Sequence, residues 1–98
     1  MITLVQEWLV QNSHLLDEMN ISRESNVTPG DSTSPLMVKA MCATTEGQFI
    51  VWEDGRGDML IADMESGEVR MSAHFVLRVN EQYLVENIIL VFMSQMKA

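Results

Sequence analysis

Residues 46–68 hold the densest set of ionisable groups in this sequence. They include seven carboxylates and a single base, Arg56, which gives the segment a net charge of −6. The carboxylates are those of Glu46, Glu53, Asp54, Asp58, Asp63, Glu65 and Glu68. Like charges at this density repel one another, so we expect them either to be screened by water and salt or to meet a cationic partner.

Carboxylates could instead bind a divalent cation, because hard cations prefer oxygen ligands. The spacing of these acids matches no EF-hand loop. Asp58 and Asp63 are five residues apart, so on one strand they would point to opposite faces. We therefore predict neither a metal site nor a cofactor, and a metal-dependent hydrolase stays an alternative that divalent-ion binding would reveal.

Nucleophilic catalysis needs a nucleophile beside a base, and the candidate residues are Cys42, His14 and His74. Cys42 stands in a run of small and apolar residues, where a buried thiol behaves as a small hydrophobic group. His74 falls on the polar side of an alternating strand, and the sequence places no acid or nucleophile beside it. The sequence therefore predicts a protein without enzymatic activity.

The size and composition of the chain indicate one globular domain over residues 1–98. Hydrophobic residues make up 47% and charged residues 20%, as in an ordinary folded protein. The net charge of −8 disfavours direct binding of nucleic acid, because affinity for phosphates comes from cations. The same charge disfavours anionic membrane surfaces.

Several features predict a cytoplasmic protein. Cys42 is the only cysteine, so no disulfide forms within the chain. Residues 1–7 lack the basic start and the small-residue cleavage site of a signal peptide. The longest apolar run, residues 88–93, is much shorter than the roughly 20 residues of a membrane span.

Apolar residues at helical spacing predict one helix over residues 3–19. Thr3 and Gln6 fit a capping box at its start, and Asn20 fits its end because asparagine tolerates a left-handed backbone. We expect Trp8, together with Trp52 farther along the chain, to pack in the core.

The middle of the chain reads as a series of strands. A short extended piece, residues 23–28, precedes a loop of turn-forming residues, 29–35. Residues 36–45 are apolar on both alternating faces except at Lys39, which predicts a central strand covered on both sides. Three further strands joined by short turns are predicted at residues 48–52, 58–64 and 69–80, the last with Val69 to Val79 alternating apolar and polar.

A second helix is predicted over residues 81–95, with Asn80 as its cap. Leu90 and Met93 leave this helix apolar nearly all round, so it needs cover on more than one side. The predicted fold class is therefore α+β: an antiparallel meander of four to five strands, flanked by an N-terminal and a C-terminal helix.

A family resemblance lies in the acidic segment. Residues 47–55, GQFIVWEDG, and residues 58–68, DMLIADMESGE, resemble small bacterial immunity proteins of contact-dependent inhibition and related polymorphic toxin systems. The chain is similar to the group called TriTu, in which an N-terminal amphipathic helix precedes a V-W-E-x-G strand end, an S-G-E turn and a C-terminal helix. The last helix of that group is more polar and rich in Glu and Leu, whereas residues 88–93 here read IILVFM.

The resemblance implies a cytosolic antidote that binds and blocks one cognate toxin domain, with a nuclease as the expected class. The active cleft of a nuclease is cationic, so an acidic protein can occupy it with fast, electrostatically steered association. Tyr83 is the candidate aromatic anchor. The acids predicted to make the contact, centred on the two turns, are Glu53, Asp54, Asp58, Asp63, Glu65 and Glu68. Whether elongation factor Tu joins the complex is left open.

The alternative is a small acidic adaptor or secretion chaperone that works as a dimer. Leu90 and Met93 would then mark a homodimer seam, because a helix that is apolar all round must be covered. The sequence leaves the choice between monomer and homodimer open.

Overall fold

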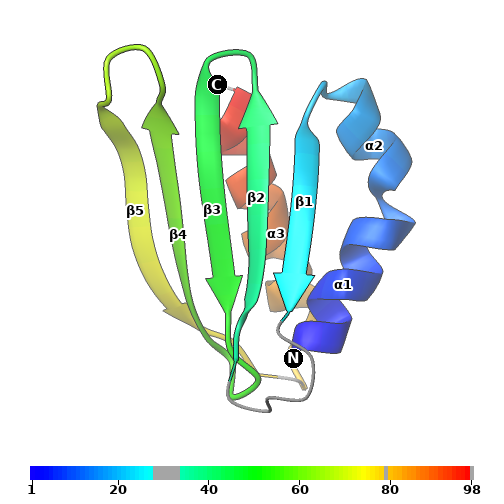
Figure 1. Ribbon diagram of the computed structural model, residues 1–98. Helices are drawn as coiled ribbons and strands as arrows, with labels where there is room; N and C mark the ends of the chain where they lie inside the picture. The colour runs from blue at the N-terminus through cyan, green and yellow to red at the C-terminus, as the bar shows by residue number, and fades with distance from the viewer. Residues whose placement is uncertain (28–33, 79, 98) are drawn as a thin grey trace.

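The computed structural model describes residues 1–27, 34–78 and 80–97. Three helices and five strands are present in this part of the chain (Figure 1). The helices are α1 (Ile2–Gln11), α2 (Ser13–Glu18) and α3 (Gln82–Lys97), and the strands are β1 (Ser22–Val27), β2 (Leu36–Cys42), β3 (Thr45–Val51), β4 (Arg56–Asp63) and β5 (Val69–Val76). Most of the predicted loop at 29–35, and also Thr28 and Val79, fall outside the described residues.

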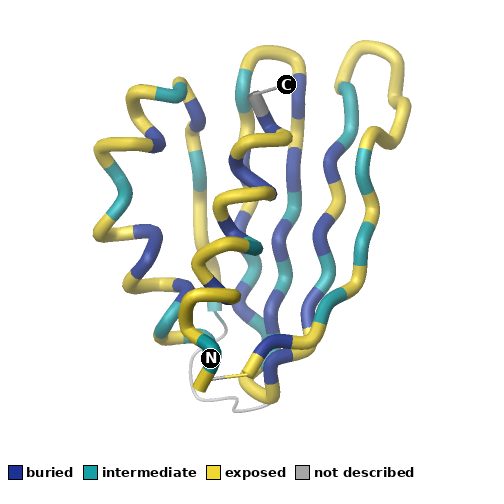
Figure 2. The backbone as a smooth tube through the Cα atoms, turned by 180° about the vertical axis from the view of Figure 1, so that it is seen from behind, coloured by how far each residue is buried: buried dark blue, intermediate teal, exposed yellow. Residues whose placement is uncertain are grey.

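The strands form a single antiparallel sheet in the order β1-β2-β3-β4-β5, which is also their order in the sequence. All three helices lie on one face of this sheet, with α3 over its middle and α1 and α2 toward β1 (Figure 2). The predicted α+β meander is therefore confirmed, with five strands. Among the described residues, no helix covers the sheet face away from α1, α2 and α3, and we call it the open face.

The core fills the space between the sheet and α3. Phe49 lies at its centre, with its ring 5.1 Å from that of Phe75 and 5.4 Å from that of Phe92. At Gly47 the helix approaches the sheet so closely that a Cβ atom would lie 2.7 Å from Cζ of Phe92. Alternate residues of β2, β3 and β4 supply the sheet side of the core, and the helices supply Val5, Trp8, Leu9, Leu16, Val85, Ile89, Phe92, Met93 and Met96.

The predicted N-terminal helix is interrupted at Asn12, which separates α1 from α2. The Asn12 side chain donates from Nδ2 to the carbonyl oxygen of Trp8 at 3.0 Å, and side chains that bond to the backbone in this way compete with helix formation. The helix begins at Ile2 rather than after a cap at Thr3, so that predicted cap is wrong. Asn20 adopts a left-handed backbone, with φ of 59°, as predicted.

The strand predicted over residues 36–45 ends at Cys42, and a turn with Ala43 at φ of 51° leads into β3. Its prediction as a strand covered on both faces is wrong, because Lys39 and Met41 are exposed. The apolar character of β2 comes from one buried row and from two methionines, Met37 and Met41, on the open face. Composition alone does not distinguish a strand covered on both faces from a strand that has apolar residues on one buried and one exposed face.

Trp8 is buried as predicted, whereas the prediction that Trp52 packs in the core is wrong. Trp52 lies half-buried on the open face, and the guanidinium of Arg56 stands 5.7 Å from its ring centroid. In β5, His74 is exposed and Phe75 is half-buried, in agreement with the predicted alternation. Val69 is exposed because the pairing of β4 with β5 is irregular at its position.

The C-terminal helix begins at Gln82, so Asn80 is not its immediate cap. Met93 is 1% exposed and belongs to the core, whereas Leu90 is 43% exposed. The two residues proposed for a dimer seam therefore do not share a surface. As described, α1, α2 and α3 all fall short of the length and apolar character that a membrane-spanning helix requires.

Candidate functional site

The predicted partner-binding acids lie at two opposite ends of the sheet. Glu53 and Asp54 belong to the turn between β3 and β4, whereas Glu65 and Glu68 belong to the turn between β4 and β5. An eight-residue strand, β4, separates the two turns, which corresponds to roughly 25 Å at the usual rise per residue. The structure therefore divides the predicted acidic site into two groups at the turns and leaves Asp58 apart from both.

At the β3–β4 turn the carboxylates have cationic partners. Oε1 of Glu53 lies 2.5 Å from the N-terminal amine of Met1. Asp54 accepts hydrogen bonds from the backbone N–H of Arg56 at 3.0 Å and from its Nε at 2.8 Å. The backbone hydrogen bond from Arg56, followed by its guanidinium, holds the pKa of the Asp54 carboxyl below its ordinary value. The charge of this turn is therefore largely compensated within the chain.

Tyr83 lies in the first turn of α3 and is 64% exposed. The start of α3 lies at the same end of the sheet as the β3–β4 turn (Figure 1). Nearby in the sequence, Nε of Arg78 lies 4.0 Å from Oε1 of Glu81. The candidate anchor is thus accessible, but it lies at the compensated end of the sheet.

Asp58 belongs to neither turn. It lies on the open face opposite His74 and pairs with Nδ1 of that ring. The pair borders a hollow of about 320 Å³ whose lining also includes Trp52, Arg56 and Val76. Asp63 lies on the other face, so the prediction that five-residue spacing separates these two acids agrees with the register.

The side chain of Asp63 organises the β4–β5 turn. Its Oδ1 accepts the backbone N–H groups of Glu65 at 2.8 Å and Ser66 at 3.1 Å. Gly67 completes the turn with φ of 74°, a conformation that glycine adopts without strain. The Glu65 and Glu68 side chains on this turn are exposed to solvent.

The β4–β5 turn differs from the other turn in its charge balance. Within the described residues, Glu46, Glu65 and Glu68 take part in no ion pair. Arg70 is the base nearest in sequence, and its Nη1 donates to Oγ1 of Thr45 at 3.0 Å. Since Thr45 is buried on the helix side of the sheet, this guanidinium is directed away from the open face. We call Glu46, Asp63, Glu65 and Glu68 the acidic end.

The candidate catalytic groups are not brought together. Cys42 Sγ faces the carbonyl oxygen of Met19 at 3.7 Å, and His14 pairs with Glu18 on α2 at 2.9 Å. Across residues 1–27, 34–78 and 80–97, no three His, Cys, Asp or Glu side chains gather as metal ligands would. Among these described side chains, the two histidines instead each pair with a carboxylate, and Asp63 hydrogen-bonds to the backbone of a turn.

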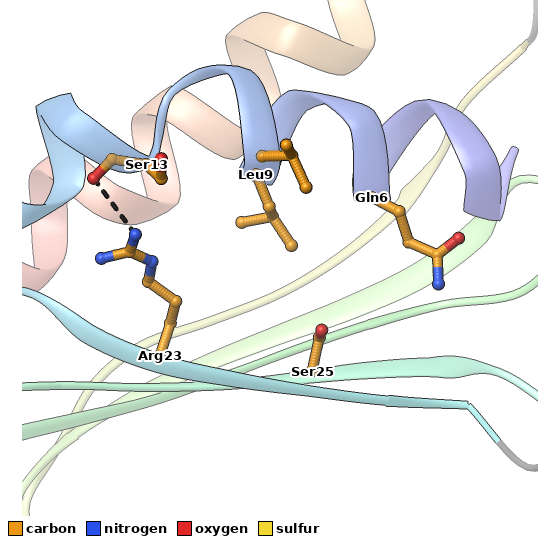
Figure 3. A pocket seen from close by; sticks show the side chains of 6 residues that line it. Gln6, Leu9, Ser13, Arg23 and Ser25 are labelled. Atoms are coloured by element: carbon orange, nitrogen blue, oxygen red, sulfur yellow. Dashed lines mark hydrogen bonds between the residues drawn. The ribbon is translucent and has the colours of Figure 1, made fainter.

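A cavity of about 450 Å³ between α1 and β1 was not predicted (Figure 3). Gln6 and Leu9 line it from the helix, and Arg23 and Ser25 line it from the strand. The Arg23 guanidinium donates to the carbonyl oxygen of Ser13 at 3.1 Å and lies 2.5 Å from Asp17. It therefore joins β1 to the start of α2, and its hydrogen-bonding groups are directed at the protein.

The open face was also missed by sequence reasoning. It combines the bases Lys39 and Arg56 with three acids, Glu24, Glu46 and Asp58, so its net charge is only −1. Most of the charge of −8 therefore lies on the turns and helices. The signal that could have revealed this face was Lys39 in the middle of an apolar strand.

No family model, curated protein or solved structure matches the chain.

Proposed function

We propose that this chain is an immunity-type inhibitor that binds a cognate, basic toxin domain through its acidic end. The observation that carries the proposal is the charge imbalance between the two turns. Asp54 at the β3–β4 turn is neutralised by Arg56, whereas Glu65 and Glu68 have no ion-pair partner among the described residues. Uncompensated carboxylates on a rigid turn are complementary to a cationic cleft.

The class of toxin domain that best fits the acidic end is a nuclease. Such a domain must hold nucleic-acid phosphates with Lys and Arg, and the acidic end would occupy that cleft in place of phosphates. Asp63 keeps the turn in one conformation before binding, so little ordering entropy is lost on association. The proposed setting is the bacterial cytoplasm, and we propose no cofactor, no metal and no catalytic step.

The test compares two charge-reversal variants that alter net charge equally. Glu46→Lys, Glu65→Lys and Glu68→Lys together reverse the acidic end, and Glu7→Lys, Glu18→Lys and Glu86→Lys reverse three exposed helix acids. The partners to test are toxin domains, first any that neighbouring reading frames encode. Calorimetry measures binding, and survival on co-expression measures neutralisation. We expect the first variant to lose about 100-fold or more in affinity, and the second to lose far less.

Two results would contradict the proposal. If both variants lost affinity equally, only overall charge would matter, and no local contact at the acidic end would be needed. If the first variant still protected cells fully, the acidic end would not be the inhibitory surface. Circular dichroism of both variants would establish that each is folded.

A further inference from the structure

Within the described residues, β5 is an edge strand whose outer side carries no other element. It is the last strand in the sheet order, and nothing lies beyond it in Figure 1. At the opposite edge, α1 and α2 run beside β1 (Figure 1). An uncovered edge presents unpaired backbone N–H and C=O groups, which are a template for pairing with another strand.

The outward backbone groups of β5 follow from the alternation of hydrogen bonds in an antiparallel sheet. The N–H of Trp52 donates to the carbonyl oxygen of Arg56 at 2.8 Å, so even-numbered residues of β4 bond to β3. Odd-numbered residues such as Met59, which pairs with Ala73, then bond to β5. The N–H and C=O groups that point away from the sheet are therefore those of Ser72, His74 and Val76.

The usual protections of an edge strand are missing from residues 71–76 of β5. From residue 71 to residue 76 the chain has no proline, lysine or arginine, and its register with β4 is regular. The irregularity lies at the start of β5, where Ile61 pairs with Met71 and Ala62 with Val69, so that Arg70 is skipped. Edge strands that must stay single carry charges, prolines or bulges in their middle.

We propose that β5 pairs antiparallel with β5 of a second copy of this chain, about a two-fold axis at Ala73. In this register, Ser72 of one copy exchanges both backbone hydrogen bonds with His74 of the other, and the symmetry repeats the exchange. Ala73 faces Ala73 of the second copy as a non-hydrogen-bonded pair. Such pairs bring side chains closest together, which suits the smallest side chain of the strand.

The apolar row on the helix side of β5 supports this register. Met71, Ala73 and Phe75 are half-buried, and no helix lies over β5 (Figure 2). Pairing about Ala73 places Phe75 beside Met71 of the second copy, twice by symmetry. Aromatic rings pack favourably against methionine sulfur and against cross-strand apolar neighbours.

The charges near the ends of β5 favour the same antiparallel arrangement. Glu68 precedes the strand and Arg78 follows it. An antiparallel pair brings the Glu68 end of one copy to the Arg78 end of the other. A shift that centred the axis on His74 would instead set the two imidazoles opposite each other. Ala73 is therefore the favoured centre.

The interface is small, because it consists of one strand edge and a few side chains. Interfaces of this size are weak, so we expect a reversible dimer that forms at high micromolar concentration. The proposal does not rest on toxin binding. Asp63 and Glu65 lie outside the paired strand, whereas Glu68 lies at the border of the dimer, so the variants that test pairing leave the acidic end unchanged. The proposed interface on β5 is also a different surface from the dimer seam on α3 that the sequence suggested.

The test uses sedimentation velocity of the purified chain from about 5 to about 500 µM, where small interfaces dissociate. Wild type should sediment faster as concentration rises. Ser72→Pro removes an outward N–H and leaves the β4 ladder intact, so it should stay folded and weaken dimerisation about tenfold or more. Ser72→Ala keeps that N–H and should behave as wild type.

A second variant tests the same interface in case Ser72→Pro does not fold. Ala73→Glu would place two carboxylates at the axis and should also give a monomer, with circular dichroism confirming the fold. A wild-type chain that stays monomeric at all concentrations would overturn the proposal. So would a dimer that Ser72→Pro leaves intact and Leu90→Glu dissociates, because its contact would then lie on α3.

Discussion

Arg70 reaches across β4 to Thr45: its Nη1 lies 3.0 Å from the Thr45 hydroxyl oxygen. Thr45 is 5% exposed, so the bond satisfies a hydroxyl that water does not reach freely. This contact joins the start of β3 to the start of β5 at the acidic end, and so connects three neighbouring strands beside the β4–β5 turn.

Replacing Thr45 by Val should lower the free energy of unfolding by about 1–2 kcal/mol. The change keeps the buried volume but removes an acceptor for a charged donor. Urea denaturation measures the effect, and Thr44→Val at the exposed neighbouring position is the matched control, expected within about 0.5 kcal/mol of wild type. Equal stability of the two variants would show that the Arg70 contact contributes nothing.

Gly47→Ala should destabilise the chain by about 1–3 kcal/mol, as overpacking does in well-filled cores. A Cβ at this position would collide with Sδ of Met96 and lie 2.7 Å from Cζ of Phe92. Thermal unfolding would measure the loss. Adding Met96→Ala should restore part of it, because the truncated side chain leaves room; no recovery in the double variant would argue against close packing of α3 on β3.

Asp54 should titrate below its ordinary pKa of 3.8, because the Arg56 backbone N–H and guanidinium stabilise the carboxylate. A lowered folded-state pKa contributes stability that is complete above 3.8 and is lost as pH falls through the lowered value. Carboxyl NMR titration measures this. In Arg56→Gln the pKa should rise only in part, since the backbone N–H remains; a full return would mean that the guanidinium alone lowers it.

Trp52→Ala should cost about 1 kcal/mol, far less than the 3–5 kcal/mol typical of a buried aromatic such as Phe49. Trp52 lies half-buried on the open face, whereas Phe49 is 1% exposed. Denaturation of Trp52→Ala and Phe49→Ala compares the two sites directly. Acrylamide should also quench Trp52 fluorescence more than that of the buried Trp8, and the reverse order would place Trp52 in the core.

The sequence was most informative where local rules decide the structure. The alternation in β5, the left-handed Asn20 and the glycine-containing turns follow from side-chain periodicity and backbone sterics, and the structure agrees. The division at Asn12 was missed because a single polar break in an apolar stripe is compatible with one helix or with two. At the division, both the side chain and the backbone N–H of Asn12 donate to the carbonyl oxygen of Trp8.

Tertiary placement was less predictable. Lys39 and Trp52 lie on an uncovered sheet face because all three helices pack on the other side, and no local pattern specifies on which side a helix docks. The acidic segment reads as one charge cluster in sequence. Its division into a compensated and an uncompensated end depends on where Arg56 and Arg70 direct their guanidinium groups.

The meander has a consequence for how the chain is made. Each strand pairs with its immediate successor, so the sheet can grow hairpin by hairpin at a small loop-closure cost while the chain is still being synthesised. Its apolar side, however, is covered largely by α3, which follows every strand. A ribosome-bound chain that ends before Phe92 would therefore expose the apolar face of its sheet. The final turns of α3 bury that face and complete the core.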